Sequence, residues 1–247
     1  MATRNARPQH EEAGETPRPS LQQKLGAEVL GTFFATLVPT AVDVLYYSGA
    51  NVDFVSRWLA RGFITVAVIY AFSEISGAHV DPAVSLGFAL RGDMRLLRML
   101  GYWVAQFAGG FIASALAFAL WGHAIAFGAS HPGPNYSHSV AVVTEIVATF
   151  LLMTIILGTA EQESAVGKQA ALAVGFTVAA CGFFAGPISG ASMNPARSIP
   201  PQIFGGQFDL IWIYAIGPCV GAALAVLVMR GILGPPKHGE EKAAQGG

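Results

Sequence analysis

Six long apolar segments dominate this sequence and decide what kind of fold it can adopt. They cover approximately residues 22–45, 58–76, 97–121, 140–160, 169–187 and 210–233. Each is close to the roughly 20 residues that an α-helix needs to cross the hydrocarbon core of a bilayer. Helices on a soluble protein would show a polar face at the helical period, whereas these segments are apolar nearly all round. The pattern predicts an all-α membrane protein with six transmembrane helices, in contact with the lipid bilayer.

The composition supports this class and argues against several others. The 247-residue chain is 53% hydrophobic and only 12% charged, about half the charged fraction of a typical soluble domain. Its net charge of −1 gives no strong attraction to nucleic acid. We find no nucleotide-binding loop, no nucleophile elbow, and no histidine or cysteine spacing typical of a metal site. We therefore expect no enzyme, no catalytic residue, no metal, no cofactor and no nucleic-acid partner.

Polar segments flank the apolar region at both ends. Residues 1–20 contain prolines and mixed charges and predict a disordered tail without a signal-peptide pattern, and residues 234–247 form a similar tail. Eleven of the 14 lysines and arginines lie in or beside these tails, around the connection between the second and third spans, or just before the fifth span, whereas Arg57 lies in an opposite loop. By the positive-inside rule, both termini are expected to be cytoplasmic.

The two halves of the chain repeat. Glu28 matches Glu145 at an offset of 117, and SGAHVDPA at 76–83 matches SGASMNPA at 189–196 at an offset of 113. YWVAQFAGG at 102–110 matches IYAIGPCVG at 213–221 more loosely, at an offset of 111. Repeat one is expected over 21–122 and repeat two over 138–233, within one membrane domain over 21–233. Because each half holds three spans, the second must be inserted upside down, as in many transport folds.

A short motif after the second span and another after the fifth each predict a half-length helix. The two motifs are Asp81-Pro82-Ala83 and Asn194-Pro195-Ala196. Aspartate and asparagine are strong N-caps, and proline suits the first helical position. A helix from Asp81 to about Arg91 would be ~16 Å long, about half the hydrocarbon core. Two such helices entering from opposite faces would direct their positive dipole ends at one point and disfavour a cation there.

These features together resemble the major intrinsic protein family, the aquaporins and glycerol facilitators, over about residues 22–233. The resemblance rests on Glu28, Gln106, Glu145, the segment GPISGASMNPARS and the two related triplets within an inverted six-span repeat. It implies an aquaporin-like fold with two re-entrant half-helices, located in a cell membrane. It also implies a passive single-file pore for water and small uncharged solutes such as glycerol, in a homotetramer with one pore per subunit.

The resemblance further implies roles for individual residues. The two triplets would form the pore centre, where Asn194 would donate its side-chain amide to the permeant. Glu28 and Glu145 would accept hydrogen bonds from the backbone of the re-entrant loops. The residues that match the outer selectivity constriction are Arg61, Gly182, Ala191 and Arg197. Small residues at 182 and 191 would widen this ring unless Arg61 folds across it.

Three positions depart from the family pattern. Asp81 replaces the usual asparagine; it would still cap a helix, but an ionised carboxylate cannot donate a hydrogen bond and partly cancels the dipole barrier. Arg61 stands where an aromatic residue is usual. It either faces the pore near Arg197, with an acid or water between the two guanidiniums, or snorkels to the outer interface. Glu74, near His79, would pair with an arginine or line the inner vestibule.

These departures leave alternative functions open. Asp81 and Arg61 together would suit an ion-conducting or proton-leaky channel. Glu74 or Asp81 would serve as the proton site if the protein were a coupled transporter. Water is the first expected permeant. A glycine at position 182 is similar to the glycerol facilitators, so glycerol or another small neutral solute is the alternative permeant.

Overall fold

The structure is a computed structural model that describes residues 18–160 and 169–234 together with Ala244. The predicted tails at 1–20 and 234–247 lie almost entirely outside the described residues. All regular secondary structure within the described part is helical, and six of its helices are long and apolar enough to cross a membrane. This confirms the predicted fold class. The helices are α1 (Leu21–Tyr47), α2 (Phe54–Ser76), α3 (Pro82–Arg91), α4 (Leu96–Trp121), η1 (Gly122–Ala124), α5 (Ile125–Gly128), α6 (His138–Ala160), α7 (Ala170–Ser189), α8 (Pro195–Gly205), η3 (Phe208–Leu210) and α9 (Ile211–Leu233).

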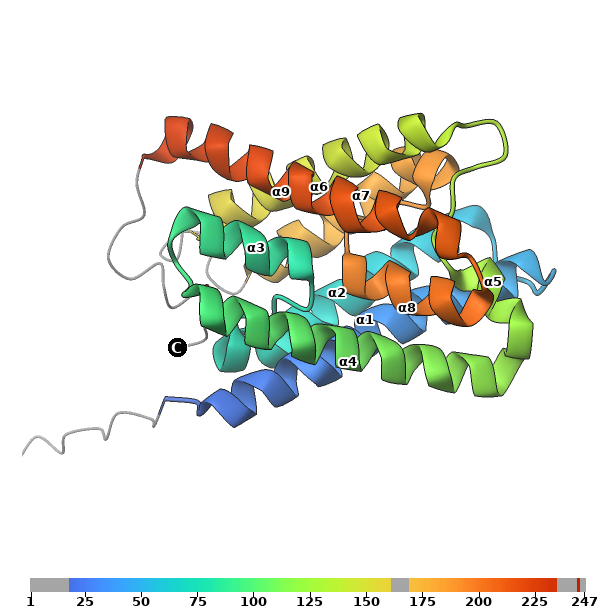
Figure 1. Ribbon diagram of the computed structural model, residues 1–247, viewed down its shortest axis with the longest axis horizontal. Helices are drawn as coiled ribbons and strands as arrows, with labels where there is room; N and C mark the ends of the chain where they lie inside the picture. The colour runs from blue at the N-terminus through green and yellow to red at the C-terminus, as the bar shows by residue number, and fades with distance from the viewer. Residues whose placement is uncertain (1–17, 161–168, 235–243, 245–247) are drawn as a thin grey trace, which may run out of the picture.

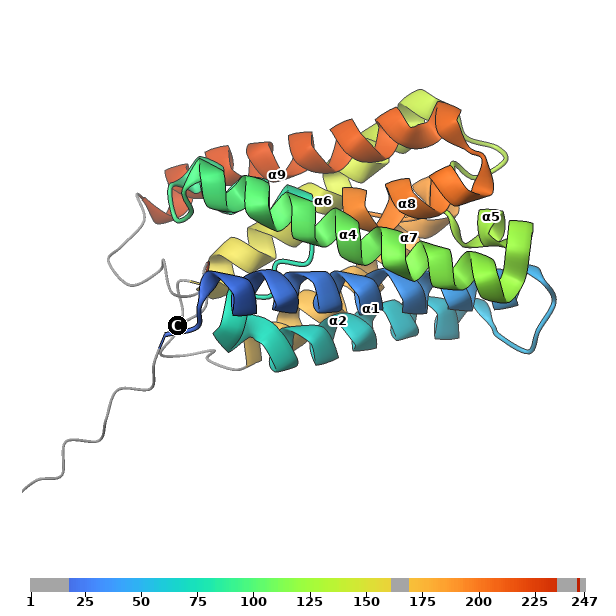
Figure 2. The same ribbon diagram turned by 60° about the horizontal axis from the view of Figure 1, so that its bottom comes forward.

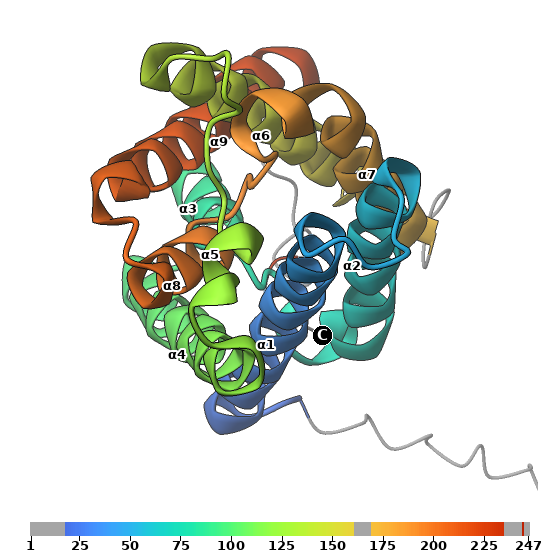
Figure 3. The same cartoon turned by 90° about the vertical axis from the view of Figure 1, so that its right-hand side faces the viewer.

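The long helices form a ring in the order α4, α1, α2, α7, α6 and α9, seen end-on in Figure 3. The two short helices α3 and α8 close the ring, since both pack against α9 and α4. Figure 1 shows that α3 and α8 enter from opposite ends of the bundle. The start of α1 and the end of α9 lie together at one end, which we call the terminal end (Figures 1 and 2). The opposite end, where α5 lies, is the distal end.

Local sequence explains why α3 and α8 are short and where they begin. Asp81 and Asn194 are the N-caps, and their side-chain Oδ1 atoms accept from backbone N–H groups of the first turn at 2.8 and 3.1 Å. Pro82 and Pro195 occupy the first helical position, and the following residues Ala83 and Ala196 are fully buried. Each helix stops at a glycine in the left-handed conformation, with φ of 106° after α3 and 73° after α8. At 10 and 11 residues, they span about half a bilayer core.

The outward faces of the long helices are strongly apolar. Leu97 and Val104 on α4 are 84% and 73% exposed, and Leu227 on α9 is 69% exposed. Such large exposed aliphatic side chains would favour aggregation in water, but they are expected where a helix faces lipid. The described helices therefore form a multi-pass membrane protein.

Close helix crossings reveal the register of the repeat more clearly than the residue matches do. A Cβ on Gly109 would collide with the carbonyl oxygen of Val29, and a Cβ on Gly221 with that of Ile146. The hydroxyls of Tyr102 and Tyr214 donate to the equivalent carbonyls of Ser76 and Ser189, at 2.8 and 2.6 Å. Both pairings have an offset of 112, so the looser sequence match at 111 was wrong by one residue. Identical residues at this offset make equivalent contacts with neighbouring backbone, which fixes the register.

The crossing of α1 and α4 gives a test of packing. We expect Gly109→Ala to destabilise the protein by about 1–3 kcal/mol, because the added methyl group meets rigid backbone of α1. Gly101→Ala, on the same helix, is the matched control, since its nearest neighbour would lie 3.7 Å away. The apparent melting temperature in detergent should fall for the first variant only. Equal melting temperatures would mean that α1 and α4 separate without cost.

Candidate functional site

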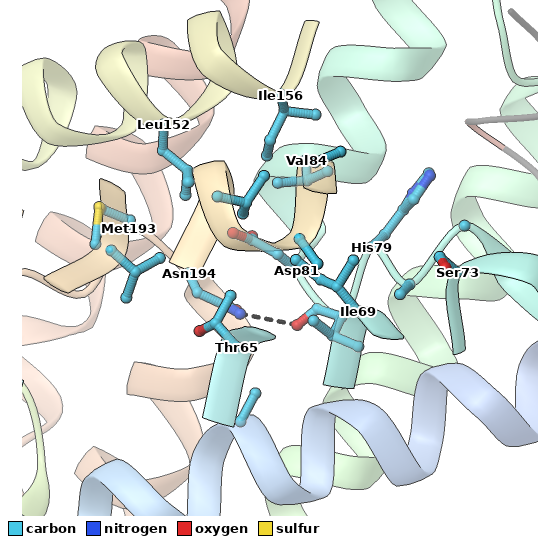
Figure 4. A pocket seen from close by; sticks show the side chains of 18 of the residues that line it. Thr65, Ile69, Ser73, His79, Asp81, Val84, Leu152, Ile156, Met193 and Asn194 are labelled. Atoms are coloured by element: carbon cyan, nitrogen blue, oxygen red, sulfur yellow. Dashed lines mark hydrogen bonds between the residues drawn. The ribbon is translucent and has the colours of Figure 1, made fainter. Parts of the chain in front are cut away.

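A cavity of about 650 Å³ lies inside the helical ring, beside the N-termini of α3 and α8. Its wall combines the loops before these two helices with side chains from α2, α6 and α7. Figure 4 shows aliphatic side chains of Val84, Leu152 and Ile156 on one side of it. Arg61 and Arg197 lie among its lining residues toward the distal end, and Glu74 toward the terminal end.

The loops before α3 and α8 hold an unusual backbone conformation twice. Ala78 and Val80 have φ of 48° and 46°, and Ala191 and Met193 have φ of 44° and 57°. Left-handed φ values are uncommon outside glycine and are outliers for a β-branched residue such as Val80. Such conformations persist only when the surrounding structure imposes them. Both pairs are related by the repeat offset of 113, so each half has the same two left-handed residues in the loop before its short helix.

Glu28 on α1 holds the first loop. Its carboxylate accepts from the backbone N–H groups of His79 at 3.0 Å and Val80 at 2.7 Å. It also accepts from the Ser76 hydroxyl at 2.6 Å and the Gln106 amide at 2.8 Å. Glu28 is fully buried, and burying a carboxylate is tolerated only with such complete hydrogen bonding. It is therefore a structural carboxylate, in the place that the sequence suggested.

Glu145 on α6 repeats this arrangement in the second loop. It accepts from the backbone N–H groups of Ser192 at 2.9 Å and Met193 at 2.7 Å, and from the Ser189 hydroxyl at 2.7 Å. In a trans peptide the C=O points opposite to the N–H of the same plane. The carbonyls of Ala191 and Ser192 therefore point away from Glu145, and both residues line the cavity. The loops thus present backbone acceptors to the cavity while their donors are used behind it.

At the centre, the two triplets contact each other. The Asn194 Nδ2 atom donates to the carbonyl oxygen of Val80 at 2.8 Å, drawn as a dashed line in Figure 4. An amide nitrogen carries two hydrogens, so this contact leaves Asn194, which lines the cavity, one further donor. Asp81 also lines the cavity, and its Oδ1 accepts from the Ala83 N–H. The structure thus gives Asp81 the capping role that its residue type suggests.

Two arginines face the cavity toward the distal end. Arg61 is 4% exposed; its Nη1 donates to the Gly190 carbonyl at 2.9 Å, and its Nη2 pairs with Asp43. Arg197 is also 4% exposed and pairs with Asp43 at 3.1 Å. Arg61 therefore lies inside the bundle beside Arg197, rather than extending to an interface. Of the acid or water expected between the two guanidiniums, the structure shows an acid, Asp43.

Gly182 does not lie among the residues that line the cavity, although Ala191 does. Trp58 covers it, since a Cβ on Gly182 or on Gly186 would collide with the indole ring. Trp58 is 1% exposed and its ring lies 4.2 Å from the Arg61 guanidinium carbon. A side chain at position 182 would therefore meet Trp58 rather than the cavity, and the small residue does not by itself widen the site.

The terminal end holds the remaining two sequence-predicted residues. His79 lines the cavity, is 3% exposed, and has its Nδ1 atom 3.0 Å from the Ser85 hydroxyl. Its ring stacks on Phe88 with centroids 4.7 Å apart. Glu74 lines the same end, next to Ser73. Within the described residues, no group of three or more histidine, cysteine, aspartate or glutamate side chains is arranged to hold a metal ion.

Sequence reasoning missed Asp43 and Ser130. The Ser130 hydroxyl bonds to Arg197 Nη1, and its carbonyl accepts from Gln202 Nε2 at 2.8 Å, so the loop after α5 supports the arginine. One signal was available for Asp43, because an ionisable residue inside an apolar span is a functional candidate by default. Ser130 gave no such signal, since its loop is polar and its contact partner lies 67 residues away in the chain.

Comparison with known proteins agrees with this geometry. The family model for the major intrinsic protein family matches residues 15–229. Aquaporin NIP1-3 of Oryza sativa subsp. japonica is 42% identical over 203 residues, covering 81% of this chain and 70% of the relative. Putative aquaporin NIP4-1 of Arabidopsis thaliana is 42% identical over 207 residues, covering 81% and 71%.

A solved structure shares the fold. The X-ray structure of the aquaglyceroporin from Plasmodium falciparum superposes with a TM-score of 0.79 at 22% identity, covering 87% of this chain and 98% of that chain. Six apolar spans, paired half-helices and a cavity between them accompany the sequence matches. The chain therefore belongs to the major intrinsic protein family and is a passive membrane channel for water and small solutes, not an enzyme.

Proposed function

We propose that this channel conducts water and small uncharged polyols such as glycerol, in single file past the N-termini of α3 and α8. The central support is the cavity itself, which has hydrogen-bonding groups on one side and aliphatic side chains on the other. Asn194 and the loop carbonyls supply the polar side, and Val84, Leu152 and Ile156 the apolar side (Figure 4). A polyol carries hydroxyls along one edge of a hydrocarbon chain, so it matches both walls.

The proposed selectivity has two parts. Arg61 and Arg197 place positive charge at one end of the cavity, which opposes entry of cations. The N-termini of α3 and α8 add positive dipole ends at its centre. Asp81 contributes a carboxyl group there, and its capping bond to Ala83 supports a structural role rather than an ion pathway. The ion-conducting alternative is therefore the less favoured one.

We further propose a cell-membrane location with both termini cytoplasmic and a homotetramer with one pore per subunit. The described ends of α1 and α9 lie at the same end of the bundle (Figure 1), and most of the basic residues that the structure describes belong to helix ends on that side. The distal end would then face outward, with Arg61 and Arg197 forming the outer constriction. Chemical crosslinking in native membranes tests the assembly, and a single crosslinked species at monomer mass would contradict it.

Stopped-flow light scattering of proteoliposomes tests the proposed permeants. After an osmotic step in an impermeant sugar, we expect faster shrinkage than in empty liposomes; under an inward glycerol gradient, we expect re-swelling. Fast shrinkage without re-swelling would restrict the permeant to water. If neither flux exceeds that of empty liposomes, the proposed function is wrong.

The same preparation tests Asp81. We expect Asp81→Asn to leave water and glycerol permeability within about twofold of wild type, because asparagine caps a helix as well as aspartate does. Voltage-clamped bilayers should show no steady conductance for either protein. A conductance that is present in wild type and absent in Asp81→Asn would favour the ion-conducting alternative.

A further inference from the structure

Asp43 lies at the centre of a cluster of three arginines toward the distal end. Its Oδ1 atom accepts from Arg57 Nε at 2.9 Å. Its Oδ2 atom accepts from Arg61 Nη2 and from Arg197 Nη2, the latter at 3.1 Å. One carboxylate thus connects α1, α2 and α8. It supplies the acidic partner in every ion pair recorded for these three arginines among the described residues.

The cluster is buried, so its charges interact strongly. Asp43 is 3% exposed, Arg57 is 6% exposed, and Arg61 and Arg197 are each 4% exposed. Two guanidiniums that share one carboxylate oxygen repel each other, and in a protein interior this repulsion is much less screened than in water. The carboxylate is what allows both arginines to occupy the same region.

The four side chains divide between the cavity wall and the layer behind it. Arg61 and Arg197 line the cavity, whereas Asp43 and Arg57 do not. Arg57 anchors Asp43 from behind, with its guanidinium carbon 4.4 Å from the ring centroid of Tyr46. Asp43 therefore acts on the cavity through the two arginines rather than by contact with a permeant.

We propose that Asp43 is the positioning residue of the outer constriction and determines which solutes pass it. The carboxylate holds the guanidiniums of Arg61 and Arg197 against the wall, so that they border the passage without crossing it. Without Asp43, the two guanidiniums repel and turn toward water in the cavity, which narrows the passage. A polyol then loses more permeability than water does, because it is the wider permeant. This inference rests on the proposed permeation path.

Asp43→Asn tests the inference in the full-length protein, reconstituted at equal density in liposomes. We expect glycerol permeability to fall about tenfold and water permeability by less, on the scale of losing one hydrogen bond to a charged group. The matched control is Asp93→Asn, which removes another buried carboxylate that pairs with an arginine, Arg91, at 3.5 Å and lies off the cavity. The control should keep both permeabilities.

The double variant Asp43→Asn/Arg61→Gln separates positioning from general support of the fold. Removing the released guanidinium should restore glycerol permeability toward the wild-type value. Wild-type permeability in Asp43→Asn, or a loss that Arg61→Gln does not restore, would overturn the inference. If Asp43→Asn alone does not fold, the double variant decides, because without the released Arg61 guanidinium it should pass glycerol near the wild-type rate, and a tenfold lower rate contradicts the inference. If wild type passes water but no glycerol, the proposed permeant is wrong, and water permeability of the same variants still tests Asp43.

Discussion

Replacing Glu145 with alanine is expected to abolish water permeability and to destabilise the fold by about 3–5 kcal/mol. Three donors converge on this carboxylate: the Ser189 hydroxyl and the backbone N–H groups of Ser192 and Met193. Glu145 is fully buried, so water does not readily take the place of its carboxylate. Each of the three donors would then remain buried without an acceptor, which costs the full desolvation free energy of that donor.

The loop would also lose its imposed conformation. Met193, with φ of 57°, has no reason to remain left-handed once its N–H lacks an acceptor. Asn194, the N-cap of α8, is the next residue, and Arg197 lies in the first turn of that helix. Both the helix cap and this constriction arginine would therefore move with the loop. Water permeability in proteoliposomes and the melting temperature in detergent measure the two effects.

Two variants control this experiment. Glu74→Ala removes an exposed glutamate at the terminal end of the cavity, and it should leave the melting temperature unchanged. Glu145→Gln keeps one acceptor oxygen but turns an amide N–H₂ toward the backbone donors, so an intermediate loss is expected. Wild-type permeability in Glu145→Ala would show that the loop conformation is intrinsic and does not depend on the carboxylate.

Replacing Arg197 with valine is expected to raise cation conductance about 100-fold while water permeability is retained. A guanidinium about 5 Å from a passing cation, at an effective dielectric constant of about 20, opposes it by about 3 kcal/mol. Its removal also frees space at the cavity wall, so glycerol permeability should rise. Voltage-clamped bilayers measure the conductance, and glycerol re-swelling measures the widening.

The matched control for this second variant is Arg91→Val. Arg91 is 5% exposed but does not line the cavity, so its removal should leave conductance at the level of empty bilayers. If Arg197→Val also stays at that level, the barrier to cations resides at the half-helix N-termini instead. That result would assign exclusion to the backbone dipoles rather than to the arginines.

Sequence alone was sufficient for features that depend on local chemistry. The lengths of the apolar segments predicted six spans, and the Asp81-Pro82 and Asn194-Pro195 pairs predicted where the two half-helices begin. Hydrophobic length, N-capping and the conformation of proline are properties of a few adjacent residues. An odd number of spans in each repeat also required an inverted arrangement, whatever the side chains in between.

Only the tertiary structure decided the contacts that depend on which helices meet. Arg61 faces the cavity because α1 brings Asp43 to it from 18 residues away. Gly182 packs against Trp58 and does not line the cavity. The register of 112 between α4 and α9 pairs Tyr102 with Tyr214 and Gly109 with Gly221, and the contacts of these residues with neighbouring backbone decided it over the match at 111. A buried charge takes its partner from whichever element lies closest in space, and its energy depends on that distance and burial rather than on sequence neighbours.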